Sequence, residues 1–289
     1  MSDILVSVSV ITYNQEQYIV QALESIIAQR TTFPFEIVIG DDCSTDTTRA
    51  ICLEYKEKYP NSIRLRLPQG NMGSMPNWIA NMDECKGKYI AFCEGDDYWT
   101  DPLKLQKQVG FLESHPDFTL CAHVSDILEY GHEIKGKVPD RDVLETADVI
   151  NQDWGIMTAS MMIRRGSLFL PDWYGNVKNG DYGLQLLISL RGKTKLLSDS
   201  MSVYRRHEAG ISNTLKPFSQ AAWVIYLLYE FDKYTAGKYK KNVLKKIKRV
   251  YKNQIGFAKE YGLRKATAML YTFKVLSCVS PFLIKNMRN

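Results

Sequence analysis

The segment Lys88-Tyr89-Ile90-Ala91-Phe92-Cys93-Glu94-Gly95-Asp96-Asp97 ends an apolar, strand-forming run in two adjacent carboxylates. Neighbouring ionised carboxylates repel each other, and a hard divalent cation relieves that repulsion because it takes oxygen ligands. A cation held by one or two protein carboxylates fills its other positions with water and substrate phosphates. The segment therefore predicts a Mg²⁺ or Mn²⁺ site that serves a nucleotide diphosphate. The alternative is a surface turn, since Gly and Asp are common turn residues.

Strand-like and helix-like segments alternate along the first hundred residues. Strands are expected at 4–12, 35–40, 63–67 and 88–94, and helices at 16–29, 46–58 and 76–85. This alternation is typical of a mostly parallel α/β sheet flanked by helices. Ligands of such sheets bind at the carboxyl ends of the strands, where the polar clusters at 12–14, 41–42 and 96–97 fall. A dinucleotide-binding domain is disfavoured because the first turn lacks the glycine-rich loop that binds phosphate.

The second part of the chain continues the pattern less regularly. We expect a helix at 102–114, a strand at 118–123, a polar loop or insertion at 129–142, a strand at 158–163, a helix at 181–190 and a strand at 201–204. Beyond Pro217 the chain becomes helical. The sequence thus predicts an α/β body followed by a C-terminal helical extension.

The composition is that of a globular protein in a reducing compartment. The chain has 289 residues, of which 45% are hydrophobic, enough for a large core. Its six cysteines form no CxxC pair and no zinc-like spacing. The N-terminus passes from Met1-Ser2-Asp3 into a strand-like segment and does not resemble a signal helix. We therefore expect a cytoplasmic protein.

The charge is strongly segregated between the body and the tail. Residues 233–289 contain fifteen Lys and Arg but one acid, Glu260. At 240–251, apolar residues share one helical face and basic residues the other, which suits either an anionic membrane or a helix packed on the body. The run 266–284 is interrupted by Lys274 and Pro281, so it predicts an interfacial helix and not a membrane span. Peripheral contact through 238–285 with the cytosolic face of a membrane is expected, and no nucleic-acid partner, because no recognition module is found.

Seven motifs, in this order, resemble those of the inverting family-2 glycosyltransferases of the GT-A fold. They are Val10-Ile11-Thr12-Tyr13-Asn14, Asp41-Asp42-Cys43-Ser44-Thr45-Asp46, Asn71-Met72-Gly73, Gly87-Lys88-Tyr89-Ile90, Glu94-Gly95-Asp96-Asp97, Gly180-Asp181-Tyr182 and Tyr204-Arg205-Arg206-His207. The match covers roughly residues 4–213. It implies a catalytic domain at 1–215, with a nucleotide-binding half at 1–100 and an acceptor-binding half at 101–215, before the extension at 216–289.

The resemblance assigns the nucleotide pocket to the ends of the first two strands. Thr12, Tyr13 and Asn14 are expected to line it, with Asp42 accepting a hydrogen bond from a ring nitrogen of the base, expected to be uracil. A buried acceptor that faces a base N–H discriminates between bases, because the wrong base leaves it unpaired. The same loop has a structural interpretation as well, in which Ser44 or Thr45 caps the next helix.

The resemblance also assigns the diphosphate and metal contacts. Asp96 is expected near the ribose, Asp97 and His207 as ligands of the metal ion, and Arg205 and Arg206 on the phosphate oxygens. These residue types suit those roles, since imidazole ligates Mn²⁺ and guanidinium groups match phosphate geometry. The alternative for His207 is a histidine in a surface loop.

Asp181 is the expected catalytic base, since an inverting displacement needs a carboxylate within hydrogen-bond reach of the acceptor hydroxyl. The alternative is a helix N-cap. The sequence departs from its relatives at two places. Many relatives carry Ala-Arg-Asn where this chain has Met75-Pro76-Asn77, and they often carry Glu-Asp where it has Gly180-Asp181. The first departure removes an arginine that would contact the diphosphate.

The resemblance implies a metal-dependent glycosyltransferase. It would move a sugar from a UDP-sugar to a hydroxyl of a glycan or lipid-linked acceptor, for a cell-surface polysaccharide or lipopolysaccharide. One alternative is a catalytically degenerate relative that binds nucleotide sugar or membrane without turnover. A sugar nucleotidyltransferase is disfavoured, because the glycine-rich triphosphate loop with Arg and Lys is missing after the first strand.

Overall fold

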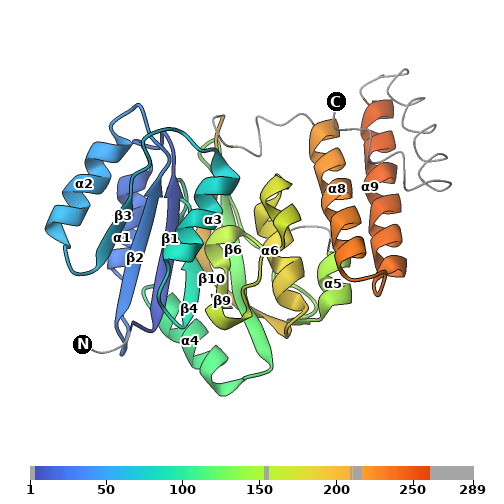
Figure 1. Cartoon of the computed structure of the whole chain (residues 1–289), viewed down its shortest axis with the longest axis horizontal. Coiled ribbons are helices and arrows are strands. Elements are labelled where there is room, and N and C mark those ends of the chain that lie inside the picture. The colour runs from blue at the N-terminus through green and yellow to red at the C-terminus, as the bar shows by residue number, and fades with distance from the viewer. Residues whose placement is uncertain (1–3, 153–155, 209, 211–216, 261–289) are drawn as a thin grey trace.

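The computed structural model describes residues 4–152, 156–208, 210 and 217–260, in which ten strands form one mixed sheet (Figure 1). The path of neighbouring strands is β3-β2-β1-β4-β9-β6-β10-β5, while β7 pairs with β6 and β8 with β10. The strands are β1 (Val6–Thr12), β2 (Phe35–Asp41), β3 (Ile63–Arg66), β4 (Tyr89–Phe92), β5 (Tyr98–Trp99), β6 (Phe118–Glu129), β7 (His132–Ile134), β8 (Val143–Leu144), β9 (Met162–Arg164) and β10 (Lys193–Arg206). The expected parallel half is confirmed, because β1 to β4 pair in parallel.

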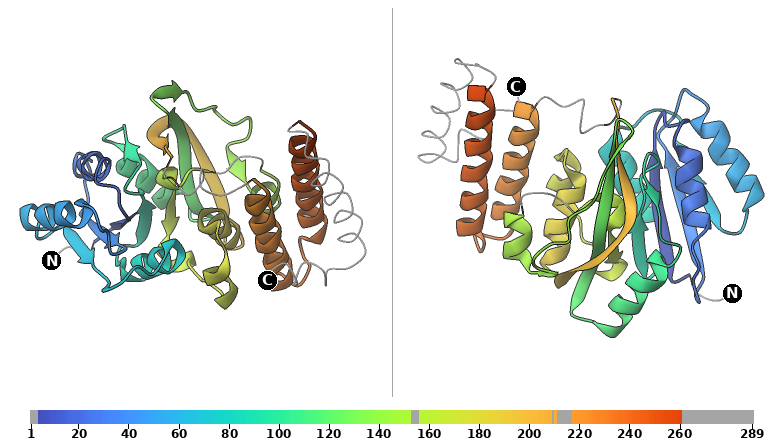
Figure 2. Two further views of the ribbon diagram at one scale, coloured as in Figure 1. Left: turned by 90° about the horizontal axis from the view of Figure 1, so that it is seen from above. Right: turned by 180° about the vertical axis from the view of Figure 1, so that it is seen from behind.

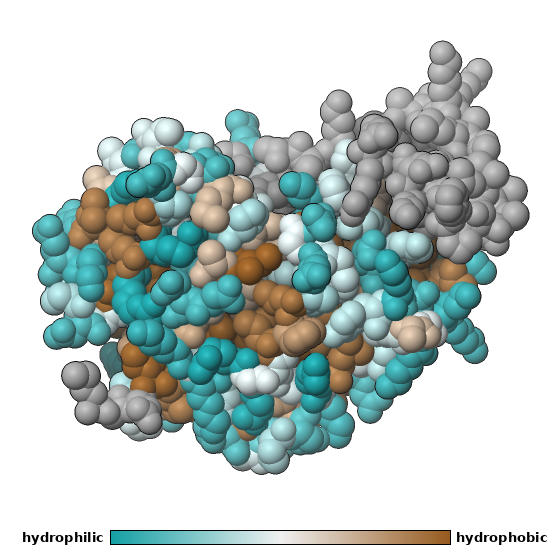
Figure 3. All heavy atoms as spheres, in the orientation of Figure 1, coloured by the Kyte–Doolittle hydropathy of each residue, from teal (hydrophilic) through white to brown (hydrophobic). Residues whose placement is uncertain are grey.

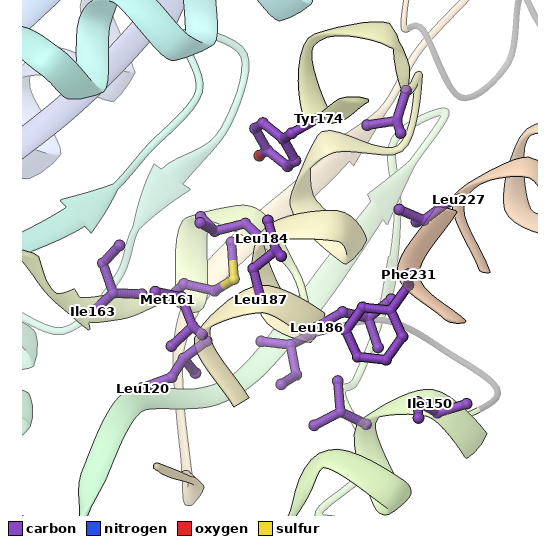
Figure 4. Packing of buried hydrophobic residues seen from close by; sticks show 14 of the residues in the cluster. Leu120, Ile150, Met161, Ile163, Tyr174, Leu184, Leu186, Leu187, Leu227 and Phe231 are labelled. Carbon is purple, nitrogen blue, oxygen red and sulfur yellow. The ribbon is translucent and has the colours of Figure 1, made fainter. Parts of the chain in front are cut away.

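Helices cover both faces of the sheet (Figure 2). They are α1 (Ile19–Ile27), α2 (Thr48–Lys58), α3 (Ser74–Glu84), α4 (Lys104–Ser114), α5 (Thr146–Asn151), α6 (Gly180–Ser189), α8 (Pro217–Tyr234) and α9 (Lys240–Glu260), with short 3₁₀ turns at Thr158–Ser160, Arg165–Ser167 and Asp172–Asn176. One core cluster joins α1, α2 and α4 to the sheet, and a second joins α3, α5, α6, α8 and α9 to its other face. Figure 4 shows the second cluster, where Phe231 and Leu227 of α8 lie beside α6.

β1 shows how a strand with alternating polar residues can be buried on both faces. Its valines enter one core, while Ser7 and Ser9 are buried toward α3. Ser7 Oγ donates to Glu36 Oε1 at 2.7 Å, and Asn81 Nδ2 donates to Ser9 Oγ at 2.8 Å. These bonds satisfy the serine hydroxyls, so the strand can lie in the middle of the sheet.

In the second half of the chain the expected helices at 102–114 and 181–190 agree with α4 and α6, but the boundaries of the expected strands were wrong. β6 and β10 are much longer than the predicted strands, because buried polar residues continue their pairing, as in the 2.8 Å contact between Ser125 Oγ and Ser202 Oγ. The predicted strand at 158–163 is a 3₁₀ turn followed by β9, and the predicted loop at 129–142 contains β7. The helical extension beyond Pro217 is confirmed for the described residues as α8 and α9.

Candidate active site at the carboxyl edge of the sheet

Two neighbouring cavities open where β1, β2, β4 and β10 end, at the edge that points to the top of Figure 1. The Asp42 cavity has a volume of ≈340 Å³ and is lined by Ile11, Thr12, Tyr13, Gln15, Asp42, Asn71, Gly73, Ser74, Asn77, Glu94, Asp96, Tyr204, Arg205 and Gly210. The His207 cavity has a volume of ≈590 Å³ and is lined by Asn14, Gln15, Glu16, Gln17, Tyr18, Asp46, Leu128, Tyr130, Gly131, Arg205, Arg206, His207 and Glu208. The structure thus brings most of the candidate residues together at one edge.

Asp42 lies in the wall of its cavity and also holds the loop before α3. It is almost fully buried, and its Oδ1 and Oδ2 accept hydrogen bonds of 2.8 Å from the backbone N–H groups of Met72 and Gly73. Gly73 has a φ of 88°, a conformation that favours glycine. Each carboxylate oxygen keeps a second lone pair, so the Asp42 side chain can also accept from a ligand.

The loop after β1 is fixed by the loop after β2. Asn14 has a φ of 52°, its backbone N–H donates to Ser44 Oγ at 2.9 Å, and its Oδ1 accepts from Thr45 N at 2.8 Å. The expectation that Ser44 or Thr45 caps α2 was wrong, because the helix begins at Thr48 and Asp46 Oδ1 accepts from Thr48 N at 3.0 Å. Ser44 and Thr45 therefore shape the site through Asn14.

Two carboxylates line the Asp42 cavity, and the charge of a third acts on one of them. Glu94 and Asp96 both line the Asp42 cavity, and Asp181 lies close enough for its charge to act on Glu94. Burial, followed by the charges of Asp96 and Asp181, raises the pKa of Glu94 to about 8, while a hydrogen bond from Thr158 opposes the shift. Burial also raises the pKa of Asp181. The sequence analysis gave Glu94 no role, although it begins the turn that carries Asp96, in which Asp97 N donates to Glu94 O at 3.1 Å.

Asp97 and Asp96 have different environments. Asp97 is fully buried, its Oδ1 accepts from Arg205 N at 2.9 Å, and its Oδ2 has no hydrogen-bond partner among the described residues. It lines neither cavity, and burial together with the charges of Asp96 and Glu94 raises its pKa well above the usual range. Asp96 is partly exposed, and its Oδ2 lies 3.0 Å from His207 Nε2. The structure therefore pairs His207 with Asp96, where the sequence analysis expected Asp97.

The two arginines that end β10 lie in the cavity walls, and the protein already holds both guanidinium groups. Arg205 Nη1 donates to Asp96 O at 2.6 Å, and the group lies over the Tyr98 ring at 4.6 Å from its centroid. Arg206 Nη1 lies 3.2 Å from Glu129 Oε1. Arg205 thus fixes the segment that carries Asp96, whether or not it also meets a phosphate.

Within the described ranges, no group of three or more His, Cys, Asp or Glu side chains is arranged to hold a metal ion. The 3.0 Å contact of Asp96 with His207 offers one oxygen and one nitrogen donor. Such a pair fits a cation that takes its other ligands from water and phosphate oxygens. Burial, and then the charges of neighbouring carboxylates, raises the pKa of both Glu94 and Asp97.

Asp181 is the second residue of α6, and Asn179 occupies the N-cap position. The backbone N–H groups of Asp181 and Tyr182 lower the pKa of its carboxyl group, and the larger effect of burial raises it. The N-cap alternative was wrong, because Asn179 takes that position, although the first backbone N–H groups of α6 still interact with the Asp181 carboxylate.

A buried hydrogen-bond chain that the sequence analysis missed fixes the start of α6. Trp78 Nε1 donates to Tyr174 Oη at 2.9 Å, and Tyr174 Oη donates to Gly180 O at 2.8 Å. A Cβ atom at Gly180 would lie 2.5 Å from Met75 Sδ. Both contacts place the residue before Asp181 against α3, and no local sequence pattern marks them.

Comparison with known proteins agrees with this geometry. The family model described as "Glycosyl transferase family 2" matches residues 7–170, more than half of the chain. An uncharacterized protein of Mycobacterium tuberculosis (strain ATCC 25618 / H37Rv) is 42% identical over 209 residues, which cover 71% of this chain and 60% of that protein. This chain therefore spans about 60% of the length of the curated relatives that it matches first.

Two enzymes with solved structures are more distant. The poly(ribitol-phosphate) beta-N-acetylglucosaminyltransferase TarS of Staphylococcus aureus is 25% identical over 214 residues, covering 71% of this chain and 36% of TarS. The structure of TarS residues 1–349 with UDP-GlcNAc has a TM-score of 0.60 at 20% identity and covers 78% of this chain and 66% of that one. The mannosyltransferase PcManGT of Pyrobaculum calidifontis, solved with GDP-Man and Mn²⁺, has a TM-score of 0.59 at 17% identity and covers 96% and 81% of the two chains.

These structures share the GT-A fold with the described chain, which confirms the fold that the sequence analysis expected. The matched segment includes the ends of β1, β2 and β4, which build the Asp42 cavity. The chain belongs to glycosyl transferase family 2.

Proposed function

We propose that this glycosyltransferase transfers a sugar from a UDP-sugar to a hydroxyl group of a glycan or lipid-linked acceptor, with inversion at the sugar carbon. The observation that carries the proposal is the convergence of Glu94, Asp96 and Asp181 beside the cavity that Asp42 lines. A nucleotide site and a carboxylate of raised pKa then share one edge of the sheet. The UDP-GlcNAc complex of TarS supports the choice of donor.

The donor nucleotide would occupy the Asp42 cavity. Thr12 and Tyr13 would form the wall around the base, with Asn14 in the neighbouring His207 cavity, and Asp42 would accept from a ring N–H with its remaining lone pairs. These residues lie in the half at 1–100, while the half at 101–215 would hold the acceptor. We therefore keep the division of the catalytic domain into these two halves as a proposal.

We assign the protein ligands of the proposed Mn²⁺ or Mg²⁺ to Asp96 and His207, in place of Asp97 and His207. Asp97 is fully buried and lines neither cavity, whereas Asp96 lines the Asp42 cavity. A bound cation would neutralise charge on the departing nucleotide diphosphate. Arg205 would hold Asp96 in place through its carbonyl group, and Arg206 would add positive charge to the wall of the His207 cavity.

Asp181 would accept the proton of the acceptor hydroxyl as it attacks the sugar carbon, while the bond from that carbon to the nucleotide phosphate breaks. A carboxyl group of raised pKa is a stronger base than an ordinary one, which suits this role when it is ionised. The start of α6 holds the group in position through Gly180.

The proposed setting is the synthesis of a cell-surface polymer, with the enzyme on the cytosolic face of a membrane. TarS, by its name, acts on poly(ribitol-phosphate), and the related GgaB of Bacillus subtilis is named a minor teichoic acid biosynthesis protein. Polyol-phosphate oligomers are therefore the first acceptors to test. Of the expected membrane-contacting segment at 238–285, the structure describes 238–260, and the run 266–284 lies outside the described residues.

The test is a rate comparison between wild type and Asp181→Asn with UDP-GlcNAc, UDP-glucose and UDP-galactose, with and without ribitol-phosphate oligomers. We expect acceptor-stimulated UDP release by the wild type and a loss of about 10²-fold to 10⁴-fold in kcat for Asp181→Asn, with UDP affinity unchanged. Equal rates for the two proteins would instead favour the degenerate relative that binds without turnover.

A further inference from the structure

The outward face of α9 carries a row of lysines, defined here as Lys241, Lys245, Lys248 and Lys252. Their spacing of four, three and four residues places them on one side of the helix. All four are exposed, and together they extend over about 16 Å of helix. Figure 3 shows hydrophilic side chains protruding along the lower right edge of the molecule, where α9 lies.

The apolar face of α9 is used by the protein itself. Val243, Ile247, Tyr251 and Ile255 are buried, and the first three belong to the core cluster that includes α5, α6 and α8. Of the two alternatives left open by the sequence, the structure shows the helix packed on the body with a solvated basic face. An apolar face that is buried in the core cannot also enter the acyl region of a bilayer.

Two further cations of α9 point inward and attach the helix to α5. Lys246 is buried and its Nζ donates to Gln152 O, while Arg249 Nη2 donates to Asn151 O. These carbonyl groups lie at the carboxyl end of α5, where the helix dipole favours a positive charge. The inward cations therefore have a structural role that the outward lysines do not share.

The lysine row has an excess of positive charge around it. Residues 233–259 contain ten Lys and Arg and no Asp or Glu. Among the described residues, none of the four lysines of the row forms an ion pair. A straight, uncompensated row of charge on the side of a rigid helix matches an extended anionic plane.

We propose that the lysine row docks the enzyme on anionic lipid headgroups by electrostatic attraction alone, with no side chain entering the acyl region. The proposal concerns where the enzyme works and does not depend on the proposed donor or base. No helix among the described residues is long and apolar enough to cross a bilayer. Basic residues near an anionic leaflet each contribute enough to change partitioning about fivefold, so four together suffice for reversible docking.

The experiment is vesicle sedimentation of the full chain with phosphatidylcholine vesicles that contain none or about 30% phosphatidylglycerol. We expect binding to the anionic vesicles only, and a weakening when ionic strength rises from about 0.05 to about 0.5 M. The quadruple variant Lys241→Gln/Lys245→Gln/Lys248→Gln/Lys252→Gln should lose about 100-fold or more in partition coefficient. Its thermal unfolding and its transfer to a soluble acceptor should match the wild type.

Two control variants test whether insertion of an apolar side chain or the overall net charge accounts for vesicle binding. Leu244, an exposed apolar residue on the same helix, is changed to Ser, and vesicle binding should stay within about twofold because nothing inserts. The double variant Lys88→Gln/Lys193→Gln removes two exposed charges from the body and should bind more tightly than Lys245→Gln/Lys248→Gln, which has the same net charge.

Four outcomes would overturn the proposal. Equal binding to neutral vesicles or a loss of binding in Leu244→Ser would indicate insertion. Unchanged binding of the quadruple variant would place the membrane contact elsewhere in the chain. Tighter binding to a soluble ribitol-phosphate oligomer or a DNA duplex than to anionic vesicles, if the quadruple variant abolishes it, would assign the row to a soluble polyanion.

Discussion

The sulfur atom of Met75 occupies the space that a side chain at position 180 would need, since a Cβ built on Gly180 lies 2.5 Å from Met75 Sδ. The two positions at which this chain departs from the motifs of its relatives are therefore in contact. The absence of a side chain at position 180 lets the start of α6 pack against Met75 of α3.

This contact predicts coupling between Met75 and Gly180. Gly180→Ala alone should displace Met75 and cost about 1 to 3 kcal/mol of unfolding free energy, as overpacking does. In Met75→Ala/Gly180→Ala the new methyl group enters vacated space, so the double variant should be more stable than the sum of the single effects by about 1 kcal/mol or more. Urea denaturation of the four proteins measures the coupling, and additivity within about 0.5 kcal/mol would show that the contact has no energetic role.

The buried chain from Trp78 through Tyr174 to Gly180 O predicts the effect of Tyr174→Phe. The variant leaves Trp78 Nε1 and Gly180 O buried without their partner, which should lower the unfolding free energy by about 2 kcal/mol. Since Gly180 precedes Asp181, kcat should fall while the Kd of UDP stays unchanged. Stopped assays and calorimetric titration with UDP measure the two quantities.

Tyr182→Phe is the matched control, because it also removes one tyrosine hydroxyl group, that of Tyr182 in α6. The Tyr182 hydroxyl donates to Ile150 O at 3.0 Å, on the opposite side of the helix start from the Tyr174 bond to Gly180 O. An equal loss of kcat in both variants would mean that the hydroxyl of Tyr174 acts only through the stability of α6.

The different environments of Asp96 and Asp97 predict different responses to removal of one charge. Stabilisation by UDP amounts to about 2.7 kcal/mol at a ligand concentration of 100 Kd. Asp96→Asn should lose the part of this stabilisation that depends on Mn²⁺. Asp97→Asn should keep that stabilisation, because the amide oxygen can still accept from Arg205 N. Thermal shift with UDP, GDP, CDP and dTDP, with and without Mn²⁺, gives the answer. The reverse pattern would return the metal to Asp97.

The raised pKa of Glu94 predicts how stability depends on pH without ligand. The folded protein keeps a proton on Glu94 up to about pH 8, whereas the unfolded chain releases it near the usual value of 4.5. Between these values the folded state binds more protons, so the contribution of Glu94 to unfolding free energy falls as pH rises. Glu94→Gln should remove this dependence and gain about 1 to 2 kcal/mol on the wild type between pH 5 and pH 8, after solvent screening. Denaturation at several pH values across this range measures the unfolding free energy of both proteins. A difference between them that does not change with pH would contradict the prediction.

The sequence could predict the parallel half of the fold because strand patterns, apolar or alternating, are separated by helix patterns from β1 to β4. It could not predict the length of β10, whose middle at Ser198, Asp199 and Ser200 is polar and interrupts the register with β6. The candidate site, too, could be predicted only in part. The ends of the strands were found, since their position follows from topology, but the orientation of each side chain was not.

Asp96 and Asp97 illustrate that limit. Two adjacent carboxylates after a strand are equivalent as a sequence pattern, although in the structure they lie in and just after a turn and have different environments. Only the contact of Asp97 with Arg205, which is 108 residues away, decides which of them faces the cavity. The contact of Trp78 with Tyr174 across 96 residues is equally invisible to a local pattern.

The attachment of α9 to α5 has a mechanical consequence. Lys246 and Arg249 tie α9 to the end of α5, and Gln152 Nε2, just beyond that end, donates to Gln185 Oε1 of α6 at 2.7 Å. A membrane bound along the side of α9 would therefore be held at a fixed distance from Asp181. The Asp42 and His207 cavities would stay open at the carboxyl edge of the sheet. The enzyme would then select acceptors by the distance from the membrane at which they present a hydroxyl group, in addition to their chemistry.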